Sequence, residues 1–336
     1  MKMKYFASII LPMYNSARTI GETLDGLEKQ NRSDFEIIVI DDGSKDDSVS
    51  IVEDFKRRSR LPVTILKQAN AGPARARNNG VTHTDSEIVI FLDSDCIPHE
   101  NLVEVLAGSL NREKKVAACS CVFKGMDKVN IAARYIDLEI TRRQEKLIGR
   151  YVDAIATMAA AYYKDVFEEL GGFDTSFRRA SGEDYDFAYK VQKAGYKIFF
   201  TDQTWVHHYH VDTLKKYLKQ QYTRGYWMVP LFLKNREKIV RGDSYSGHEA
   251  QVQFILSCLA LLSIPLAFWK PYALAIGFGL LLLSNLTLGV WAFKRDQRFL
   301  LLAPVIASLR SLAGTIGVFR STLDIIGGIA WRSSRN

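Results

Sequence analysis

Closely spaced carboxylates follow two short apolar segments of this chain. Asp93 and Asp95 come directly after the apolar run 88–92, and Asp42 follows the run 36–40. Two buried carboxylates one residue apart are unstable unless a cation or a hydrogen-bond donor pairs with them. A divalent cation with oxygen ligands relieves the repulsion and keeps coordination positions for diphosphate oxygens. The spacing therefore indicates a metal site that neutralises a departing nucleotide diphosphate.

Other polar side chains are expected near this pair. Asp42 is placed to accept hydrogen bonds from a base or a ribose, and the segment 71–80 carries Arg75 and Arg77, which reach phosphates or hold the aspartates. Arg75 is equally well explained as a surface charge. One such cluster is also typical of turns and helix caps, but clusters at three of four strand ends are not expected by chance. The third cluster follows the run 6–11 and contains Pro12, Met13, Tyr14 and Asn15.

A second acidic group begins a predicted helix farther along the chain. Helical periodicity places Asp184 on the apolar face with Phe187 and Val191, and it places Glu183 on another face. Asp184 is thus expected to point inward as part of a second half of the site. The alternative is structural, because Ser181 followed by Asp184 has the pattern of a capping box and acids stabilise a helix N-terminus.

Histidines alternate in the segment 205–210, WVHHYH. Strand alternation places His208 and His210 on one face and His207 on the opposite face. A lone histidine is usually a satisfied polar residue, whereas alternate histidines near a carboxylate cluster are candidate metal ligands or phosphate partners.

The elements that must position these residues alternate between strand and helix. The runs 6–11, 36–40, 63–67 and 88–92 are short, β-branched or aromatic, and bounded by Pro, Asn, Asp or Gly, so they are predicted to be buried parallel strands. Helical repeats separate them, which predicts right-handed crossovers and a doubly wound α/β sheet. Ligands bind at the carboxyl ends of such strands. The helical repeats are Ile20, Leu24 and Leu27, then Val49, Val52 and Phe55.

Composition limits the possible partners of the 336-residue chain. Its formal charge is +8, but the basic residues are dispersed and no zinc-finger, helix-turn-helix or RNA-binding signature accompanies them. We therefore exclude a nucleic acid partner and expect a protein beside an anionic lipid leaflet. The cysteines have no paired spacing for a zinc site and are predicted to be structural. They are Cys96, Cys119, Cys121 and Cys258.

The C-terminal part is predicted to be a membrane region, 251–336. Roughly 20 apolar residues span a bilayer core, so the segments 251–269 and 272–293 are predicted to form a helical hairpin, with a hydrophobic domain of a soluble protein as the alternative. The segment 299–319 contains Arg310, which is costly at the bilayer centre, and it is predicted to be re-entrant or interfacial.

Taken together, these motifs resemble the inverting family 2 glycosyltransferases with the GT-A fold, over about residues 5–230. The resemblance implies a Rossmann-like GT-A catalytic domain over 1–212, then amphipathic interface helices over 213–250 and the all-α membrane region. Each motif is weakly specific alone, but all follow the family's order and approximate spacing. They are PMYN, IVIDDGS, NAGPARARNNG, FLDSD, GGFD and GEDYDF.

The resemblance also implies a role for each candidate residue. Asp184 matches the catalytic base, with Glu183 beside it. Asp93 and Asp95 match the metal and diphosphate motif, which binds Mn²⁺ or Mg²⁺, and His208 matches a histidine that completes the metal or phosphate site. The residues that match the nucleotide-sugar pocket are Pro12, Tyr14, Asn15, Asp42, Arg77, Asp93 and Ser94.

The implied function is that of a metal-dependent inverting hexosyltransferase. It would move a sugar from a UDP- or GDP-sugar to a lipid-linked or glycan acceptor at the cytoplasmic face of the inner membrane, in cell-surface polysaccharide or glycolipid synthesis. The alternatives are a polyprenyl-phosphate glycosyltransferase, whose lipid phosphate is the nucleophile, and a non-catalytic nucleotide-binding protein of the same fold. The segment 221–227 only loosely resembles the Gln-x-x-Arg-Trp motif of processive synthases, which favours transfer of one or a few sugars. The motifs do not distinguish the nucleotide and sugar of the donor, the position of the new linkage, or whether the protein self-associates.

Overall fold

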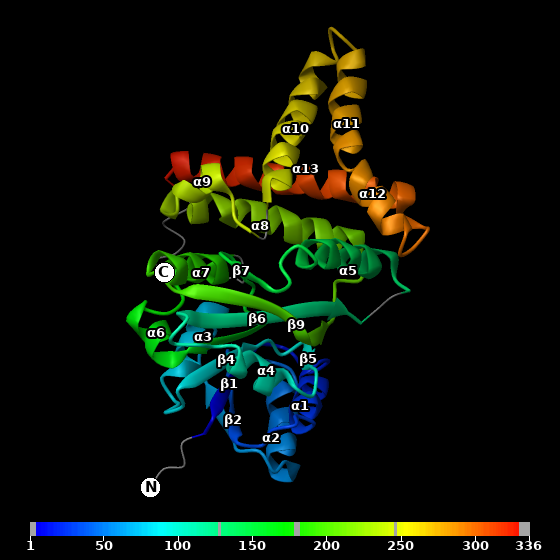
Figure 1. Cartoon of the computed structure of the whole chain (residues 1–336). Coiled ribbons are helices and arrows are strands. Elements are labelled where there is room, and N and C mark those ends of the chain that lie inside the picture. Colours follow the sequence, from blue (N-terminus) through cyan, green and yellow to red (C-terminus); the bar gives the residue numbers. More distant parts are fainter. Residues whose placement is uncertain (1–4, 127–128, 178–181, 245–246, 329–336) are drawn as a thin grey trace. The chain divides into compact units, whose positions relative to one another are not determined.

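The structure is a computed structural model that describes residues 5–126, 129–177, 182–244 and 247–328 (Figure 1). The chain divides into two compact units. The first comprises Met1–Met126 and Arg143–Tyr209, and the second comprises Asp127–Arg142 and His210–Asn336. The segment 127–142 therefore packs with the second unit, whereas the sequence analysis assigned it to the catalytic domain.

A nine-stranded sheet forms the centre of the first unit. One half has the order β3-β2-β1-β4 and is entirely parallel. β1, β2 and β4 are almost wholly buried and rich in Ile, Val, Leu and Phe, as expected for parallel strands covered on both faces. The four predicted strands are confirmed. They are β1 (Ala7–Met13), β2 (Phe35–Asp41), β3 (Val63–Lys67) and β4 (Ile88–Leu92).

The other half of the sheet is mixed, in the order β8-β6-β9-β5. β8 is antiparallel to β4 and β6, β6 is parallel to β9, and both β5 and β7 are antiparallel to β9. The doubly wound parallel pattern therefore describes only the N-terminal half of the sheet. The additional strands are β5 (Cys96–Pro98), β6 (Val116–Gly125), β7 (Arg150–Val152), β8 (Ala159–Tyr163) and β9 (Lys197–His208).

Helices connect these strands and bury their apolar faces. α1 buries Ile20, Leu24 and Leu27, the repeat that predicted it. Gly80 lets α3 approach the sheet closely, because a Cβ there would lie 2.6 Å from the side chains of Ile10 and Ile40. The helices of this unit are α1 (Ile20–Glu28), α2 (Ser48–Arg58), α3 (Pro73–Val81), α4 (Leu102–Gly108), α6 (Lys164–Glu169) and α7 (Glu183–Lys193).

The second unit consists of helices and their connecting loops over the residues described. α10 and α11 form a hairpin, and α13 lies along α8 (Figure 1). Glycines bring the backbones of α8 and α13 together, since a Cβ at Gly225 would lie 2.0 Å from the carbonyl oxygen of Gly314. The helices are α5 (Ile131–Gln144), α8 (Leu214–Lys234), α9 (Glu237–Arg241), α10 (Gly247–Leu266), α11 (Tyr272–Ser284), α12 (Leu286–Phe293) and α13 (Phe299–Ile326).

Three helical stretches of this unit are strongly apolar. α10 over Glu249–Leu266 and α13 are each long and apolar enough to cross a membrane, with mean hydropathies of 1.5 and 1.8. α11 and α12 meet the same criterion together, but they are bent by 41° at their junction. The bend is at Asn285, whose side-chain amide donates to the carbonyl oxygen of Leu281 and accepts from Gln253. The single predicted helix 272–293 is therefore two helices.

Candidate active site

The loops after β1 and β2 are joined by hydrogen bonds at the carboxyl edge of the sheet. The backbone N–H of Asn15 donates to Ser44 Oγ (2.9 Å), and the N–H of Lys45 donates to Asn15 Oδ1 (2.8 Å). Pro12 lies in β1 next to the last residue of the strand, and Tyr14, just after the strand, is 49% exposed. These predicted nucleotide-sugar residues thus lie together, with an aromatic face open to a ligand.

Asp42 holds a neighbouring loop. Its buried carboxylate accepts hydrogen bonds from Gln68 Nε2 (2.8 Å) and from the backbone N–H groups of Ala71 (2.8 Å) and Gly72 (2.9 Å). A carboxylate has about four acceptor positions, so these contacts leave little capacity for a base or ribose. In this geometry Asp42 fixes the loop that leads into α3.

Arg77 joins two acidic groups that are far apart in sequence. Its guanidinium, 3% exposed, donates to Asp93 Oδ1 (2.7 Å) and to Glu183 Oε1 (3.0 Å). Burial acts to lower the pKa of Arg77, but the adjacent carboxylates of Asp93 and Glu183 outweigh it and raise that pKa. Arg77 therefore stays charged and ties the strand-end aspartate to the start of α7.

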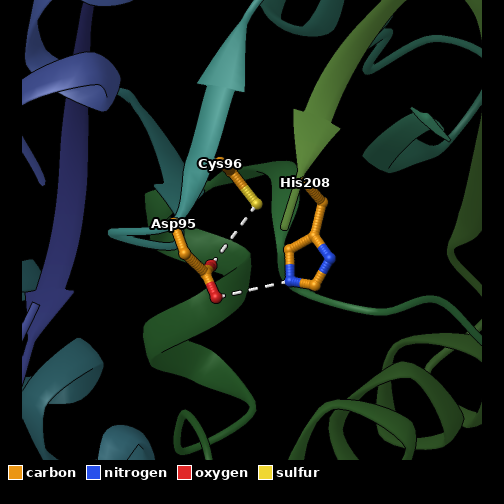
Figure 2. Close-up of side chains that lie close together, drawn as sticks. All are labelled: Asp95, Cys96 and His208. Carbon is orange, nitrogen blue, oxygen red and sulfur yellow. Dashed lines mark hydrogen bonds and ion pairs between the residues drawn. The ribbon is translucent and has the colours of Figure 1, made fainter. Parts of the chain in front are cut away.

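Asp95, the second aspartate of the pair, lies close to Cys96 and His208 (Figure 2). His208 Nε2 lies 3.4 Å from Asp95 Oδ2, and the Cys96 thiol lies 3.8 Å from Asp95 Oδ1. Burial acts to raise the pKa of Asp95, but the hydrogen bond and charge of His208 outweigh it and lower that pKa. Cys96, predicted to be structural, thus lies beside two predicted metal ligands.

The donor atoms of these three residues fit a divalent metal ion. All three lie within 4.8 Å of one another, and bonds of about 2.0–2.3 Å place two ligands of one ion roughly 3–4.5 Å apart. Burial and the neighbouring charge of Asp95 raise the pKa of Asp93 although Arg77 acts to lower it. A cation would relieve this repulsion. Among the described residues the compact group excludes Asp93, which faces Arg77.

The two predicted catalytic acids begin α7, and their burial differs from the expectation. Glu183 is buried, and its second oxygen accepts from the N–H of Gly182 (3.1 Å). Asp184 is half-buried, with Oδ1 accepting from the N–H of Tyr185 (2.9 Å). Helical periodicity predicted instead that Asp184 lies on the buried face. The pattern contains no information about Arg77, whose guanidinium pairs with Glu183 and allows that carboxylate to be buried. Ser181, the predicted cap residue, lies outside the described residues.

Two motif residues position this edge of the sheet without being among the predicted site residues. Asn78 Nδ2 donates to the carbonyl oxygen of Phe173 (2.8 Å), and the N–H of Phe173 donates to Asn78 Oδ1 (3.0 Å). Gly172 adopts φ 63°, and a Cβ there would lie 2.8 Å from Asn78 Oδ1. The GGFD turn is therefore held against α3. Ser94, a predicted site residue, shares a 2.7 Å hydrogen bond with Ser16.

Comparison with known proteins agrees with this geometry. Residues 8–171 match the model of the family described as Glycosyl transferase family 2. Glycosyltransferase AglE of Haloferax volcanii is 25% identical over 239 residues, which cover 70% of this chain and 77% of that protein. The O-antigen chain rhamnosyltransferase RfbN of Salmonella typhimurium is 28% identical over 281 residues, which cover 81% of this chain and 86% of that protein.

A solved structure has a similar fold. It is the mannosyltransferase PcManGT from Pyrobaculum calidifontis in complex with GDP-Man and Mn²⁺, with a TM-score of 0.62, 20% identity, and coverage of 96% of this chain and 88% of that one. At this identity the likeness shows the fold alone, which is GT-A. The fold and the family match together define the class of protein as a glycosyltransferase. The chain contains a glycosyl transferase family 2 domain over residues 8–171.

Proposed function

We propose that this protein is a membrane-attached inverting glycosyltransferase that moves a sugar from a nucleotide-diphosphate-sugar to a lipid-linked or glycan acceptor. The observation that carries the proposal is the bridge from Asp93 through Arg77 to the start of α7. It brings the predicted diphosphate motif and the predicted base, Asp184, to one edge of the sheet.

The acidic residues near the bridge have separate roles in a single displacement at the anomeric carbon of the sugar. Asp184, half-buried at the start of α7, accepts the proton of the acceptor hydroxyl as the hydroxyl oxygen attacks the anomeric carbon. Glu183 has both oxygens engaged, so we assign it the role of positioning α7 through Arg77. One base is sufficient, because inversion needs no carboxylate nucleophile.

The leaving nucleotide diphosphate requires neutralisation. Asp95 and His208 would hold a divalent cation, Mn²⁺ or Mg²⁺, which supplies positive charge to the diphosphate oxygens. The similar mannosyltransferase was solved with GDP-Man and Mn²⁺, which supports a nucleotide-sugar and a metal here. The exposed ring of Tyr14 supplies a surface for the base, and Asp42 maintains the loop beneath it.

The apolar helices are proposed to attach the protein to the cytoplasmic face of the inner membrane. α10 and α11 form the hairpin that enters the bilayer. α13 is also long enough to cross, but it lies along α8 (Figure 1), whose exposed Lys215, Lys219 and Arg224 would be costly inside hydrocarbon. We therefore place α8 and α13 together at the headgroups.

Such an anchor favours an acceptor that is itself in the membrane. We propose a lipid-linked glycan or polyprenyl-phosphate-based acceptor, used in cell-surface polysaccharide or glycolipid synthesis. The relative RfbN, an O-antigen chain rhamnosyltransferase, supports this choice. If the acceptor is a lipid phosphate rather than a sugar hydroxyl, the nucleophile is already ionised and depends less on Asp184.

The test is a panel of nucleotide-sugars incubated with the full chain in lipid vesicles, with Mn²⁺ or Mg²⁺ and lipid acceptors. We expect one donor to release nucleotide diphosphate in a metal-dependent reaction, and Asp95→Ala to lower the rate at least about 100-fold. Asp54→Ala is the matched control, because Asp54 is an exposed carboxylate on α2 that pairs with the exposed Arg57. Release from no donor, or equal release by Asp95→Ala, would contradict the proposal.

A further inference from the structure

Cys96 occupies a position that the chemistry proposed so far does not use. Its side chain is fully buried, and its sulfur lies within 4.8 Å of a carboxylate oxygen of Asp95 and a ring nitrogen of His208. Figure 2 shows the thiol directed toward the Asp95 carboxylate, with the imidazole of His208 on the neighbouring strand. The thiol is therefore part of the wall of the predicted metal site.

The sheet itself fixes this arrangement. β5 pairs antiparallel with β9, and Cys96 is directly opposite His208 in the register. Residues directly opposite in an antiparallel pair project to the same face with Cβ atoms about 4.5–5.5 Å apart. The ladder continues through Ile97 opposite His207 and Pro98 opposite Val206, so the relative placement of sulfur and imidazole depends on the backbone rather than on flexible side chains.

We propose that the Cys96 sulfur is a third protein ligand of the metal ion expected at Asp95 and His208. This inference rests on the metal site of the proposed function and deepens it. A carboxylate oxygen alone suits Mg²⁺ and Mn²⁺, imidazole suits Zn²⁺, Co²⁺ and similar ions, and a thiolate selects softer ions. The set of one oxygen, one nitrogen and one sulfur donor thus favours a thiol-binding cation over Mg²⁺. The thiol proton passes to water when the metal binds.

The first test is Co²⁺ titration of the metal-free full chain in lipid vesicles. A sulfur ligand gives Co²⁺ a near-ultraviolet charge-transfer absorption, so we expect this band in the wild type and its loss in Cys96→Ser. Cys119→Ser and Cys258→Ser are matched controls, because these cysteines lie on β6 and α10 outside the group of three. The band should persist in both. A band that persists in Cys96→Ser, or that is lost in a control, would overturn the proposal.

The second test compares affinities, because any site of this kind binds Zn²⁺ more tightly than Mn²⁺ and only the change on mutation is informative. We expect Cys96→Ser to weaken Zn²⁺ and Co²⁺ binding by about 10–100-fold and Mn²⁺ binding by much less, about threefold or below. Equal weakening for all ions would mean that Cys96 acts only on folding.

X-ray absorption of the Zn²⁺-loaded wild type requires no variant. One sulfur at about 2.3 Å supports the proposal, and a shell of oxygen and nitrogen alone at about 2.0–2.1 Å refutes it.

The metal site of the proposed function and the role of Cys96 can be refuted independently of each other. Metal binding that is unaffected by Asp95→Ala would refute the metal site of the proposed function, whereas binding that requires Asp95 but shows no sulfur signature would refute only the role of Cys96.

Discussion

Each unit of the molecule places an arginine against acidic or polar groups that are distant in sequence. Arg77 is buried and Arg310 is half-buried, and their partners differ. In the first unit, Arg77 joins Asp93 to Glu183. In the second unit, Arg310 of α13 donates to Glu139 of α5 and Gln253 of α10. Tyr217 of α8 donates to the other oxygen of Glu139 (2.5 Å), so this network connects four helices.

The exposure of one acidic partner separates the two cases, because Glu183 is as enclosed as Glu139 but Asp93 is not. Asp93 remains 26% exposed although it accepts from Arg77, so the pair faces an open edge of the sheet. Glu139 is only 7% exposed and accepts from both Arg310 and Tyr217. An arginine whose acid is still open can orient a reacting group, whereas one whose acid is enclosed can only fix packing. This difference predicts activity effects for the first unit and stability effects for the second.

The largest effect is expected at Asp184, the half-buried acid next to Glu183 at the start of α7. Asp184→Asn should lower kcat about 10²–10⁴-fold, because the amide cannot accept the acceptor proton. The donor KM should change little. Steady-state release of nucleotide diphosphate measures both. Glu183→Gln is the matched variant, and it should cost much less, because its amide oxygen still accepts from Arg77 and only the N–H of Gly182 loses its acceptor. A loss below about tenfold in Asp184→Asn would favour an ionised lipid phosphate as the nucleophile.

Arg77→Met tests whether the ion pairs of Arg77 with Asp93 and Glu183 contribute to both activity and stability. It leaves the carboxylates of Asp93 and Glu183 without their cation, and such a loss costs about 3–5 kcal/mol in the free energy of unfolding. Nucleotide-diphosphate release should fall with it, since α7 loses its connection to the aspartate motif. Thermal unfolding of the full chain by circular dichroism, together with the release assay, measures the two effects. Full stability with lost activity would indicate a direct contact between Arg77 and the substrate.

Arg310→Met should affect stability alone. Leaving Glu139 without its cation is expected to cost about 3 kcal/mol, with no change in donor KM or metal affinity. Adding Glu139→Gln should recover part of the loss, because the amide can still accept from Tyr217 without a buried charge. Thermal midpoints of both single variants and the double variant give the coupling. A donor KM that rises in Arg310→Met would erase the distinction between the two arginines.

The sequence predicted the parallel half of the sheet because its strands are continuous apolar runs bounded by turn residues. It did not predict β8, because the alanines of Ala159–Tyr163 have a low strand propensity and only pairing with β4 and β6 stabilises the strand. It also could not place 127–142 with the second unit. The partners of that segment, such as Arg310, lie well over a hundred residues away.

The candidate site was predicted as a set of residue types but not as a set of contacts. Asp93, Asp95, His208 and Asp184 stand out because carboxylates and histidines at strand and helix ends suggest chemistry. Cys96 does not, because its relation to His208 arises from the register of β5 and β9. The burial of Glu183 likewise depends on Arg77, 106 residues away, and local periodicity contains no information about it.

The smallest expected effect concerns the glycines that hold α13 along α8. A Cβ at Gly225 would lie 2.0 Å from the carbonyl oxygen of Gly314, so Gly225→Ala should separate the helices and cost about 1–3 kcal/mol. Gly279→Ala on α11 is the matched control, because nothing lies within 4 Å of its Cβ position. There alanine should be neutral or stabilising by up to about 1 kcal/mol. Thermal midpoints in the same vesicles measure both. Equal midpoints would mean that the polar network around Arg310, rather than close backbone packing, keeps α13 beside α8.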